Sequence, residues 1–354
     1  MAGIASWAAG FASYNPRMPP PPFPPVSRRL DLPGFRIGHG SDVAGMTGVT
    51  VVLCPEGATA AAEVRGTATG TRQFDSLVAG RHIANRAHAV VLAGGSAFGL
   101  SSADAVVDWL AERGHGFQTG VVPVPLVPTA ILFDLGFGEP TARPGRDLAE
   151  AALATAAQGE IPVGSVGAGT GATVGKALGR EQAMKGGFGF ASFTVPGGPT
   201  VAAAVAVNAF GDVRRLDGSF LAGCRTGPGS HELAGADRVF ASLPPDAGSV
   251  WEGNTTLGVV MTDAALSKAG AAKVCEMAFG GFYRTLVPAL SLYDGDLLVT
   301  LASGPVRAHV HQIGILAERA VAEAILTAVA EADGFGVLPA VRDLRPPTLL
   351  SHGS

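Results

Sequence analysis

The stretch Gly253-Asn254-Thr255-Thr256-Leu257-Gly258-Val259-Val260-Met261 decides the fold expected for this chain. Its second half is a short apolar run, typical of a buried strand. Its first half places a threonine hydroxyl beside a peptide carbonyl, after a glycine whose backbone tolerates strain. If the Thr255 hydroxyl attacks the Asn254 carbonyl carbon, the amide becomes an ester, and hydrolysis leaves Thr255 as a new chain terminus. Its free α-amine can then act as the base for its own hydroxyl.

The same residues have two other interpretations. Asn254-Thr255-Thr256 matches the N-x-Thr glycosylation acceptor, and it is also an ordinary entry from a turn into a strand. The tetrapeptide alone therefore does not establish a self-processing amidohydrolase, and further motifs elsewhere in the chain are needed to support that interpretation.

Composition limits the class of protein. The chain has 354 residues, of which 47% are hydrophobic and 15% charged, so it can bury a large core in one domain or two. The net charge is −4 and no basic stripe is present, so we expect no nucleic-acid partner. Few charges on a hydrophobic chain indicate a covered surface, and hence a homo-oligomer.

The sequence also lacks several features, and each absence leads to a prediction. Cys54, Cys224 and Cys275 are odd in number and far apart, which favours reduced structural thiols. No apolar stretch reaches the length of a membrane span, so no membrane partner is expected. Residues 1–14 contain no Lys or Arg, which makes a poor signal peptide and favours the cytoplasm. Without H-E-x-x-H or Cys/His spacing typical of zinc, we expect neither a metal nor a cofactor.

The order of the predicted elements indicates α/β layers. Residues 1–28 form a Pro-rich flexible tail, and folding is expected to start near Leu32. Strands are predicted at 49–53, 89–93, 130–135, 190–195, 201–207, 256–262 and 297–301, and helices at 97–113, 148–158, 265–279 and 312–331. Residues 164–190 are Gly-rich, and residues 223–249 form a long loop directly before the suspected cleavage bond.

Three further motifs each have a structural and a functional interpretation. Gly94-Gly95-Ser96 does not fit the G-x-S-x-G spacing, so Ser96 is interpreted as a helix cap whose neighbouring backbone could line a pocket. The Gly-rich segment 167–172 does not follow a strong strand, so a nucleotide site is rejected. That segment could instead carry Lys176 into a buried site, whereas an ordinary Lys176 would be solvated. Asp294-Gly295-Asp296 is either a turn or a pair of acids that orients an amine.

Together these residues resemble a known family. The marks are the segments 94–100, 167–169, 175–176, 207–208, 253–256 and 294–296, in matching order and spacing from about residue 32 to 335. The chain is similar to the self-processing aminopeptidases, a family that contains the β-aminopeptidases, the D-aminopeptidases and the endo-type 6-aminohexanoate (nylon) oligomer hydrolase. The resemblance implies a four-layer αββα sandwich of the N-terminal-nucleophile hydrolase type.

The resemblance also implies roles for individual residues. Thr255 would be the nucleophile, released by cleavage after Asn254. Lys176 would help to set the protonation of the terminal amine, since a nearby ammonium lowers the pKa of an amine. Asn208 would donate a hydrogen bond to the oxyanion. Asp294 and Asp296 would position the Thr255 amine.

Processing would divide a single domain into two chains. Residues 29–254 and the tail would form the α chain, and residues 255–354 the β chain. Such chains stay associated and assemble further, so the expected partner is a second copy, in a dimer or tetramer of αβ units.

Two departures bear on the substrate. The β- and D-aminopeptidases use Ser as nucleophile and lack the acidic pair, so Thr255 with Asp294 and Asp296 favours the nylon-oligomer branch. Against that branch, its active-site tyrosine is matched by Phe133, which cannot donate a hydrogen bond. From the nucleophile and the acidic pair we expect hydrolysis of 6-aminohexanoate oligomers or related polyamides. Three alternatives stay open: β- or D-residue aminopeptidase, acyl transfer of the ornithine acetyltransferase type, and a processed but catalytically silent binding protein.

Overall fold

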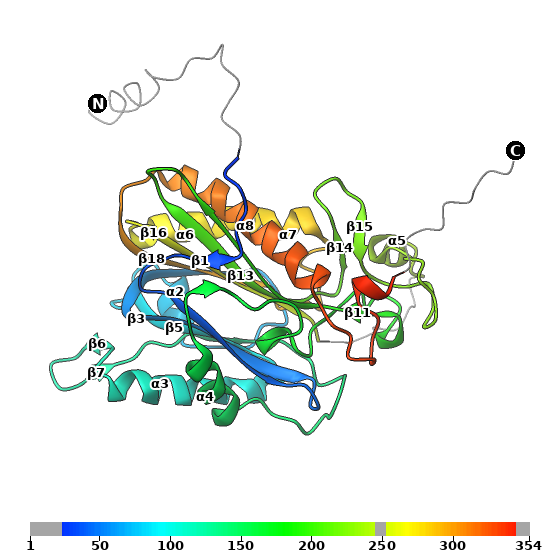
Figure 1. Cartoon of the computed structure of the whole chain (residues 1–354), viewed down its shortest axis with the longest axis horizontal. Coiled ribbons are helices and arrows are strands. Elements are labelled where there is room, and N and C mark those ends of the chain that lie inside the picture. The colour runs from blue at the N-terminus through cyan, green and yellow to red at the C-terminus, as the bar shows by residue number, and fades with distance from the viewer. Residues whose placement is uncertain (1–22, 245–252, 345–354) are drawn as a thin grey trace, which may run out of the picture.

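The computed structural model describes residues 23–244 and 253–344, and these form four stacked layers. In Figure 1, helices α6, α7 and α8 cover one side of the strands, and helices α3 and α4 cover the other. Nine of the strands form one continuous hydrogen-bonded sheet in the order β12-β13-β16-β18-β3-β5-β8-β4, with β2 also paired to β3. The first four strands make one inner layer, and β2, β5 and β8 make the other.

Strand β3 links the two inner layers. Its first half, residues 47–53, pairs with β2 and β5, and its second half, residues 59–64, pairs with β18. An irregularity between Leu53 and Ala58 separates the halves, and bulges of this kind bend a strand. The larger strands are β2 Arg36–Asp42, β3 Thr47–Val64, β5 Arg86–Ala93, β8 Thr129–Ile131, β12 Gly187–Thr194, β13 Thr200–Asn208, β16 Thr255–Ala264 and β18 Leu297–Val306.

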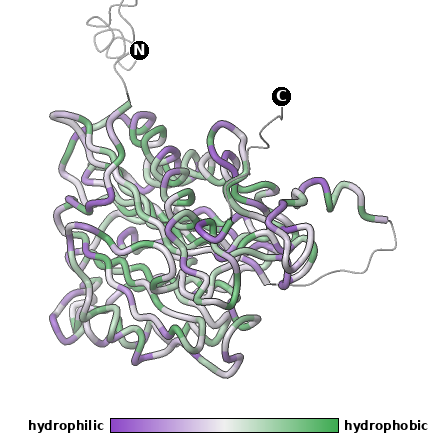
Figure 2. Tube along the Cα trace, turned by 45° about the vertical axis from the view of Figure 1, so that its right-hand side comes forward, coloured by the Kyte–Doolittle hydropathy of each residue, from purple (hydrophilic) through white to green (hydrophobic). Residues whose placement is uncertain are grey.

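Three hydrophobic clusters fill the three spaces between the layers. Along β13, Val201, Ala203, Val205 and Val207 face helices α6 and α8, while the alanines between them face the other strand layer. This alternation follows from the two-residue period of a strand. A third cluster joins β3 and β5 to α3 and α4. Figure 2 shows the hydrophobic segments running through the interior. The predicted four-layer αββα sandwich is therefore confirmed.

The four predicted helices are present with shifted ends, as α3 Ser102–Glu112, α4 Arg146–Thr155, α6 Lys268–Ala278 and α8 Val310–Ala330. Three short helices were not predicted: α2 Asp75–Val78, α5 Ala236–Ala241 and α7 Gly280–Thr285. Helix α8 packs closely on β12, where a Cβ added at Gly189 would lie 1.8 Å from the Ala324 oxygen. The glycine at this position therefore allows the backbones to approach.

The prediction that Ser96 caps a helix is wrong. Residues Ser96–Ser101 form a 3-10 turn before α3, and Gly95 rather than Ser96 precedes it. Ser96 has φ +54°, and its own N–H donates to the Leu132 oxygen at 3.0 Å. Because the chain turns sharply after Gly94-Gly95, the Ser96 side chain does not reach the free N–H groups of the turn.

Several short elements lie where loops or longer strands were predicted. The strand predicted over 130–135 ends at Ile131, because the chain then turns toward Asp134. The Gly-rich segment contains the short strands β10 and β11, the long loop contains helix α5, and residues 245–249 of that loop lie outside the described residues. The short strands are β1 Arg29–Leu30, β4 Thr71–Arg72, β6 Phe117–Gln118, β7 Pro123–Val124, β9 Gly159–Glu160, β10 Thr173–Val174, β11 Met184–Lys185, β14 Asp212–Arg214, β15 Phe220–Ala222 and β17 Leu286–Val287.

The described part of the N-terminal segment lies against the sandwich. Ser27 exchanges backbone hydrogen bonds of 2.9 and 2.8 Å with Ser192 in β12, and β1 pairs with β9. Ordered structure thus begins before Leu32, because the main chain after the prolines can donate and accept normally. Residues 1–22 of the predicted tail lie outside the described residues.

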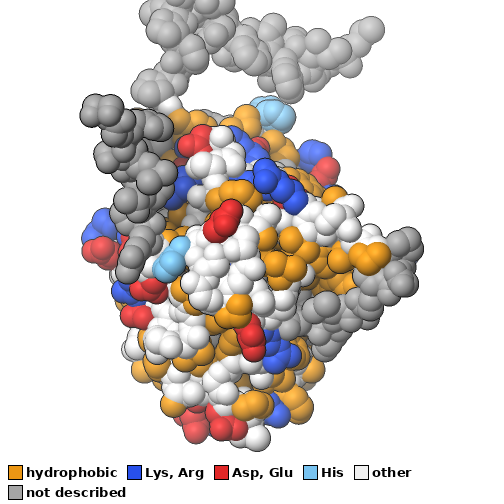
Figure 3. Space-filling view, turned by 90° about the vertical axis from the view of Figure 1, so that its right-hand side faces the viewer, with side chains coloured by type: hydrophobic (Ala, Val, Ile, Leu, Met, Phe, Trp, Pro, Cys, Tyr) orange, Lys and Arg blue, Asp and Glu red, His pale blue; other side chains and the backbone are white. Residues whose placement is uncertain are grey.

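Surface properties complete the description. The three cysteines are buried with free thiols, as predicted. Acidic and basic side chains are interspersed on the face in Figure 3. Within residues 23–244 and 253–344, no helix combines the length and apolarity that crossing a membrane requires.

Candidate active site

Neighbouring strand ends bring the predicted site residues together. Thr255 begins β16 and lies opposite Asn208, the last residue of β13. Asp294-Gly295-Asp296 leads into β18, the parallel neighbour of β16. Lys176 follows β10 and reaches the end of β13. Thr255, Lys176, Asn208, Asp294 and Asp296 are each no more than 2% exposed.

The carbonyl of Asn254 is held between two donors. The Gly295 N–H donates to its oxygen at 2.9 Å, and the Thr255 hydroxyl donates to the same oxygen in a short contact. The hydroxyl is thus beside the carbonyl that it would attack, and the Gly295 amide is aimed at the oxygen on which negative charge would develop.

Gly295 was not among the residues predicted from the sequence. A Cβ added there would lie 2.5 Å from the Thr255 hydroxyl oxygen and 2.6 Å from the Ala68 oxygen. Residue 295 therefore has to lack a side chain. The glycine between the two aspartates was the available sequence signal, and it was interpreted only as part of a turn.

Lys176 is fixed by oxygen acceptors around Asn208. Its ammonium donates to the main-chain oxygens of Thr173, Asn208 and Ala209 at 3.0, 3.3 and 3.1 Å, and to Asn208 Oδ1 at 3.2 Å. Asn208 Oδ1 also accepts from the Thr173 N–H at 3.0 Å. The lysine is therefore buried rather than solvated, and it holds the Asn208 side chain in one orientation.

Phe133 contributes its backbone. The Asn208 amide nitrogen donates to the Phe133 oxygen at 2.9 Å, and the Phe133 side chain packs on Gly253, where a Cβ would lie 2.7 Å from it. In the chain with residues 254 and 255 joined, one of the two N–H groups of the Asn208 amide thus donates to Phe133. Its donation to a substrate oxyanion stays a prediction.

The two aspartates act on the backbone around Thr255. Asp296 accepts from the Thr256 N–H at 2.7 Å, one residue beyond the proposed nucleophile. Asp294 accepts from the Phe210 N–H at 3.1 Å and from the Ser291 hydroxyl at 2.6 Å. Burial raises the pKa of both carboxyls, and for Asp296 the neighbouring Asp294 raises it further. The acids therefore fix the strand ends, and their contact with a free Thr255 amine stays a prediction.

Gly95 approaches this region through Asp134, whereas Ser96 takes no part in the contacts described above for Thr255. The Gly95 N–H donates to Asp134 at 2.6 Å, and the Thr47 hydroxyl donates to the same carboxyl at 2.8 Å. Asp134 directly follows Phe133, so this buried carboxyl ties the Gly94-Gly95 turn to the Phe133 backbone.

Asp134 gives the fold a testable pH dependence. Burial raises the pKa of Asp134 from 3.8 to about 6, although its hydrogen bonds from Gly95 and Thr47 oppose the rise. Between pH 4 and 6 the unfolded chain loses this proton and the folded chain keeps it, so stability falls as pH rises. We expect this group alone to remove about 2 kcal/mol of the free energy of unfolding over that range.

Urea unfolding of wild type and Asp134→Asn at pH 4, 5, 6 and 7 measures this contribution. Between pH 4 and 6, the free energy of unfolding of the asparagine variant should fall less than that of the wild type, and the difference should equal this amount. Equal slopes for the two proteins would exclude Asp134 as the source.

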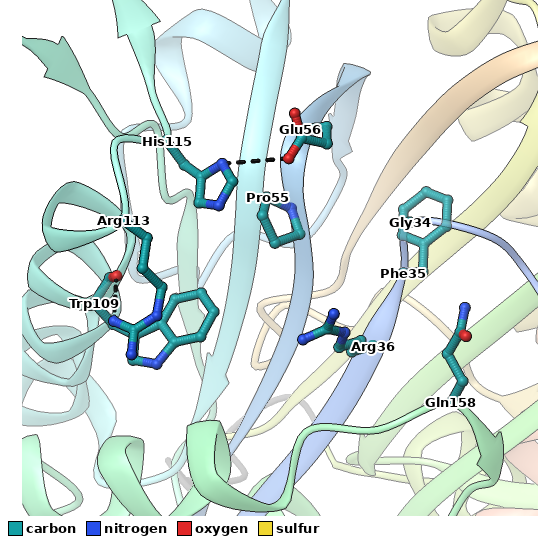
Figure 4. A pocket seen from close by; sticks show the side chains of 9 residues that line it. All are labelled: Gly34, Phe35, Arg36, Pro55, Glu56, Trp109, Arg113, His115 and Gln158. Atoms are coloured by element: carbon teal, nitrogen blue, oxygen red, sulfur yellow. Dashed lines mark hydrogen bonds and ion pairs between the residues drawn. The ribbon is translucent and has the colours of Figure 1, made fainter.

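A very small pocket of about 10 Å³, with room for about one water molecule, adjoins the site. Its lining residues are Phe133, Gly136, Phe137, Thr173, Lys176, Arg180 and Gly253. A wider pocket of about 360 Å³ lies between α3 and the start of β2 (Figure 4), and it shares no lining residue with the first. Among the described residues, no group of three or more His, Cys, Asp or Glu is placed to hold a metal ion.

Comparison with known proteins identifies the family. The model of peptidase family S58 matches residues 29–340. The chain belongs to peptidase family S58. It is therefore a hydrolase that acts on amides.

Related sequences cover most of the chain. It is 36% identical to an uncharacterized aminopeptidase of Mycobacterium leprae, over 89% of this chain and 93% of that protein. It is 30% identical to the 6-aminohexanoate-oligomer endohydrolase of Kocuria sp. (strain KY2), over 78% of this chain and 74% of that protein.

Solved structures show the same fold in more distant proteins. A Burkholderia sp. beta-aminopeptidase has a TM-score of 0.65 at 19% identity, with 89% of this chain and 90% of that chain covered. The L-aminopeptidase D-Ala-esterase/amidase of Ochrobactrum anthropi, described as a variant of the Ntn hydrolase fold, has a TM-score of 0.63 at 16% identity, with 89% of each chain covered. The family and the fold expected from the sequence are both confirmed.

Proposed function

We propose that this member of family S58 cleaves its own Asn254–Thr255 bond and then hydrolyses linear amides, of the 6-aminohexanoate oligomer type, through an ester on Thr255. The observation that carries the proposal is the position of the Thr255 hydroxyl against the Asn254 carbonyl, whose oxygen also accepts from Gly295 N–H.

In self-cleavage, the Thr255 oxygen bonds to the Asn254 carbonyl carbon, and the carbon–nitrogen bond breaks. The hydroxyl proton passes to the departing nitrogen, which becomes the Thr255 amine. Water then hydrolyses the ester, leaving a carboxylate on Asn254 and a free hydroxyl on Thr255. In turnover, a substrate carbonyl takes the place of the Asn254 carbonyl, and the Thr255 amine receives the hydroxyl proton.

The two chains would stay together after cleavage. Strand β16 from residues 255–354 lies between β13 and β18, and β18 pairs in turn with β3 from the first chain. Strands of the first chain thus lie on both sides of β16 and β18 from the second chain. This order supports a single domain that holds together after the Asn254–Thr255 bond is cleaved. Cytoplasmic location, assembly into dimers or tetramers of αβ units, and the lack of nucleic-acid partners stay predictions.

A β- or D-residue aminopeptidase is the second candidate. The relative from Mycobacterium leprae and the Burkholderia structure carry aminopeptidase names, while the Kocuria relative is an oligomer endohydrolase. Acyl transfer of the ornithine acetyltransferase type is the third candidate, and no contact in the site favours it.

Product analysis of the processed protein tests the proposal. Incubation with a linear 6-aminohexanoate oligomer should release shorter oligomers by internal cleavage, detected by mass spectrometry, and an acyl adduct should form on the chain that begins at Thr255. Stepwise release of single N-terminal residues would support the aminopeptidase instead. Transfer of an acetyl group to an amine acceptor would support the transferase, and no turnover after complete cleavage would overturn the proposal.

A further inference from the structure

The peptide unit that supplies the Gly295 N–H is held from its other side. A trans peptide is planar, so its N–H and its C=O point in opposite directions. The N–H of this unit donates to the Asn254 oxygen at 2.9 Å. Its carbonyl oxygen is that of Asp294, which accepts from the Thr67 and Ala68 N–H groups at 2.9 and 3.1 Å. The direction of the Gly295 N–H is therefore set by two donors on the far side of its own peptide.

The two donors belong to residues 65–68, which extend the pairing of β3 with β18 beyond the strand ends. In this segment the Arg65 and Gly66 N–H groups both donate to the Asp296 oxygen, at 3.1 and 2.9 Å. Two main-chain oxygens of the turn 294–296 thus each accept two hydrogen bonds from one segment. Contacts at both ends of the turn hold the peptide between them in one orientation.

Glycines allow the two segments to lie in direct backbone contact. A Cβ added at Gly66 would lie 2.2 Å from the Asp296 nitrogen, and one added at Gly295 would lie 2.6 Å from the Ala68 oxygen. Real Cβ atoms do not approach other atoms so closely, so a side chain at either position would push the segments apart. The short hydrogen bonds to the Asp294 and Asp296 oxygens therefore depend on glycine on both sides.

The segment also has an anchor at the surface. The Thr67 hydroxyl donates to the Leu292 oxygen at 2.7 Å, two residues before Asp294. Thr67 is exposed, whereas Thr255 is 2% exposed. The anchor can therefore be removed without disturbing the packed core.

Hydrogen bonds to the Asp294 oxygen also make the Gly295 N–H a stronger donor. Hydrogen bonds that run in a chain polarise one another, because each acceptor becomes more electron-poor at its own donor group. Negative charge develops on the oxygen that faces this N–H when the Thr255 oxygen attacks the carbonyl carbon. The segment would therefore stabilise the transition state more than the ground state.

We propose that residues 65–68 are a positioning segment, which aims the Gly295 N–H at the oxyanion and polarises it, both in self-cleavage and in turnover. The inference rests on the proposed function and adds to its site a segment that acts through the Gly295 peptide. It predicts that the rate of self-cleavage and kcat fall together while KM changes little, because an interaction made only in the transition state lowers kcat and kcat/KM equally.

Substitutions at Thr67 give the mildest test. Thr67→Val removes the hydroxyl with little change of shape and should lower both rates by about fivefold, the effect of one hydrogen bond. Thr67→Ser keeps the hydroxyl and should restore the wild-type rates. Thr119→Val is the matched control, because Thr119 is also exposed and its hydroxyl also donates to a main-chain oxygen at 2.7 Å, that of Val122 in the β6–β7 hairpin.

Gly66→Ala gives the larger effect. The added Cβ has to displace the backbone of the acidic turn, and a displacement of about 1 Å in a catalytic group can cost about 10²-fold in rate. Gly40→Ala is its control, since a Cβ there would lie 2.0 Å from the Leu148 oxygen in α4. The control should lower the melting temperature and leave kcat of the folded protein unchanged. If Gly66→Ala does not fold, the Thr67 series still decides.

Two rates are measured for each variant. Mass spectrometry follows the appearance of the two chains after synthesis, and hydrolysis of a linear 6-aminohexanoate oligomer by the cleaved protein gives kcat and KM. Thr67→Val with wild-type rates, Thr67→Ser as slow as Thr67→Val, or a loss confined to KM overturns the inference alone. If the wild type does not cleave itself, the proposed function fails and the inference fails with it. If it cleaves itself but leaves the oligomer intact, the substrate proposal fails and the rate of self-cleavage still tests the segment.

Discussion

Replacing Thr255 by Ala leaves the purified protein as one uncleaved chain without measurable amide hydrolysis. The hydroxyl in contact with the Asn254 carbonyl is lost, so neither the self-cleavage ester nor the acyl ester of turnover can form. Loss of a nucleophile in an acyl-transfer site lowers kcat by a factor on the order of 10⁶. Mass spectrometry of the denatured protein and an amide hydrolysis assay measure both effects.

Two other substitutions at the same position make the result specific. Thr255→Ser keeps the hydroxyl and should still cleave and turn over, whereas Thr255→Val keeps the shape and should do neither. Thr255 is 2% exposed, so melting temperatures of all three variants are needed to exclude unfolding. An Ala or Val variant that still divides into two chains would show that another group attacks the bond.

Lys176→Met is expected to slow self-cleavage and turnover by about 10³-fold. The ammonium orients Asn208 through its Oδ1 and main-chain oxygens, and Asn208 lies opposite Thr255 in the sheet. Its charge would also favour the neutral, basic form of the Thr255 amine. Proton-transfer groups in active sites commonly contribute factors of about 10² to 10⁴. The rates of chain cleavage and of substrate hydrolysis are the measurements.

Lys185→Met is the matched control for Lys176→Met. Lys185 is also fully buried, and its ammonium donates to the main-chain oxygens of Gly169, Ala172 and Gly186 at 2.8 to 3.0 Å. Both substitutions remove a donor from buried carbonyls, so both should lower stability, by about 1–3 kcal/mol for each oxygen left unpaired. Of the two lysines, Lys176 is the one whose ammonium donates to Asn208. If Lys185→Met costs as much activity as Lys176→Met, the activity loss reflects stability and not the site.

The strong periodic signals predicted the long strands and helices well, whereas the four-layer sandwich was expected from the family resemblance. Apolar runs marked β13, β16 and β18, and the long helix near residue 312 was found within two residues at its start. These elements are long enough for the alternation of buried and exposed side chains to specify them. The short strands β10 and β11 were missed because two-residue strands inside a Gly-rich segment have no readable period.

The chemistry of single side chains was easier to predict than that of the backbone. Thr255, Lys176, Asn208, Asp294 and Asp296 were named through the motifs of the family that the sequence resembles, because their side chains carry the reactive or polar groups there, and their catalytic roles stay predictions. The Gly295 N–H and the Phe133 oxygen could not be named, since every residue has such groups and only tertiary structure aims them.

Self-cleavage is the central claim, and the intact mass of the purified wild-type protein under denaturing conditions tests it most directly. Two masses, matching residues 1–254 and 255–354, are the predicted result. They would place a free amine on Thr255. A single full-length mass that persists after prolonged incubation would contradict the account.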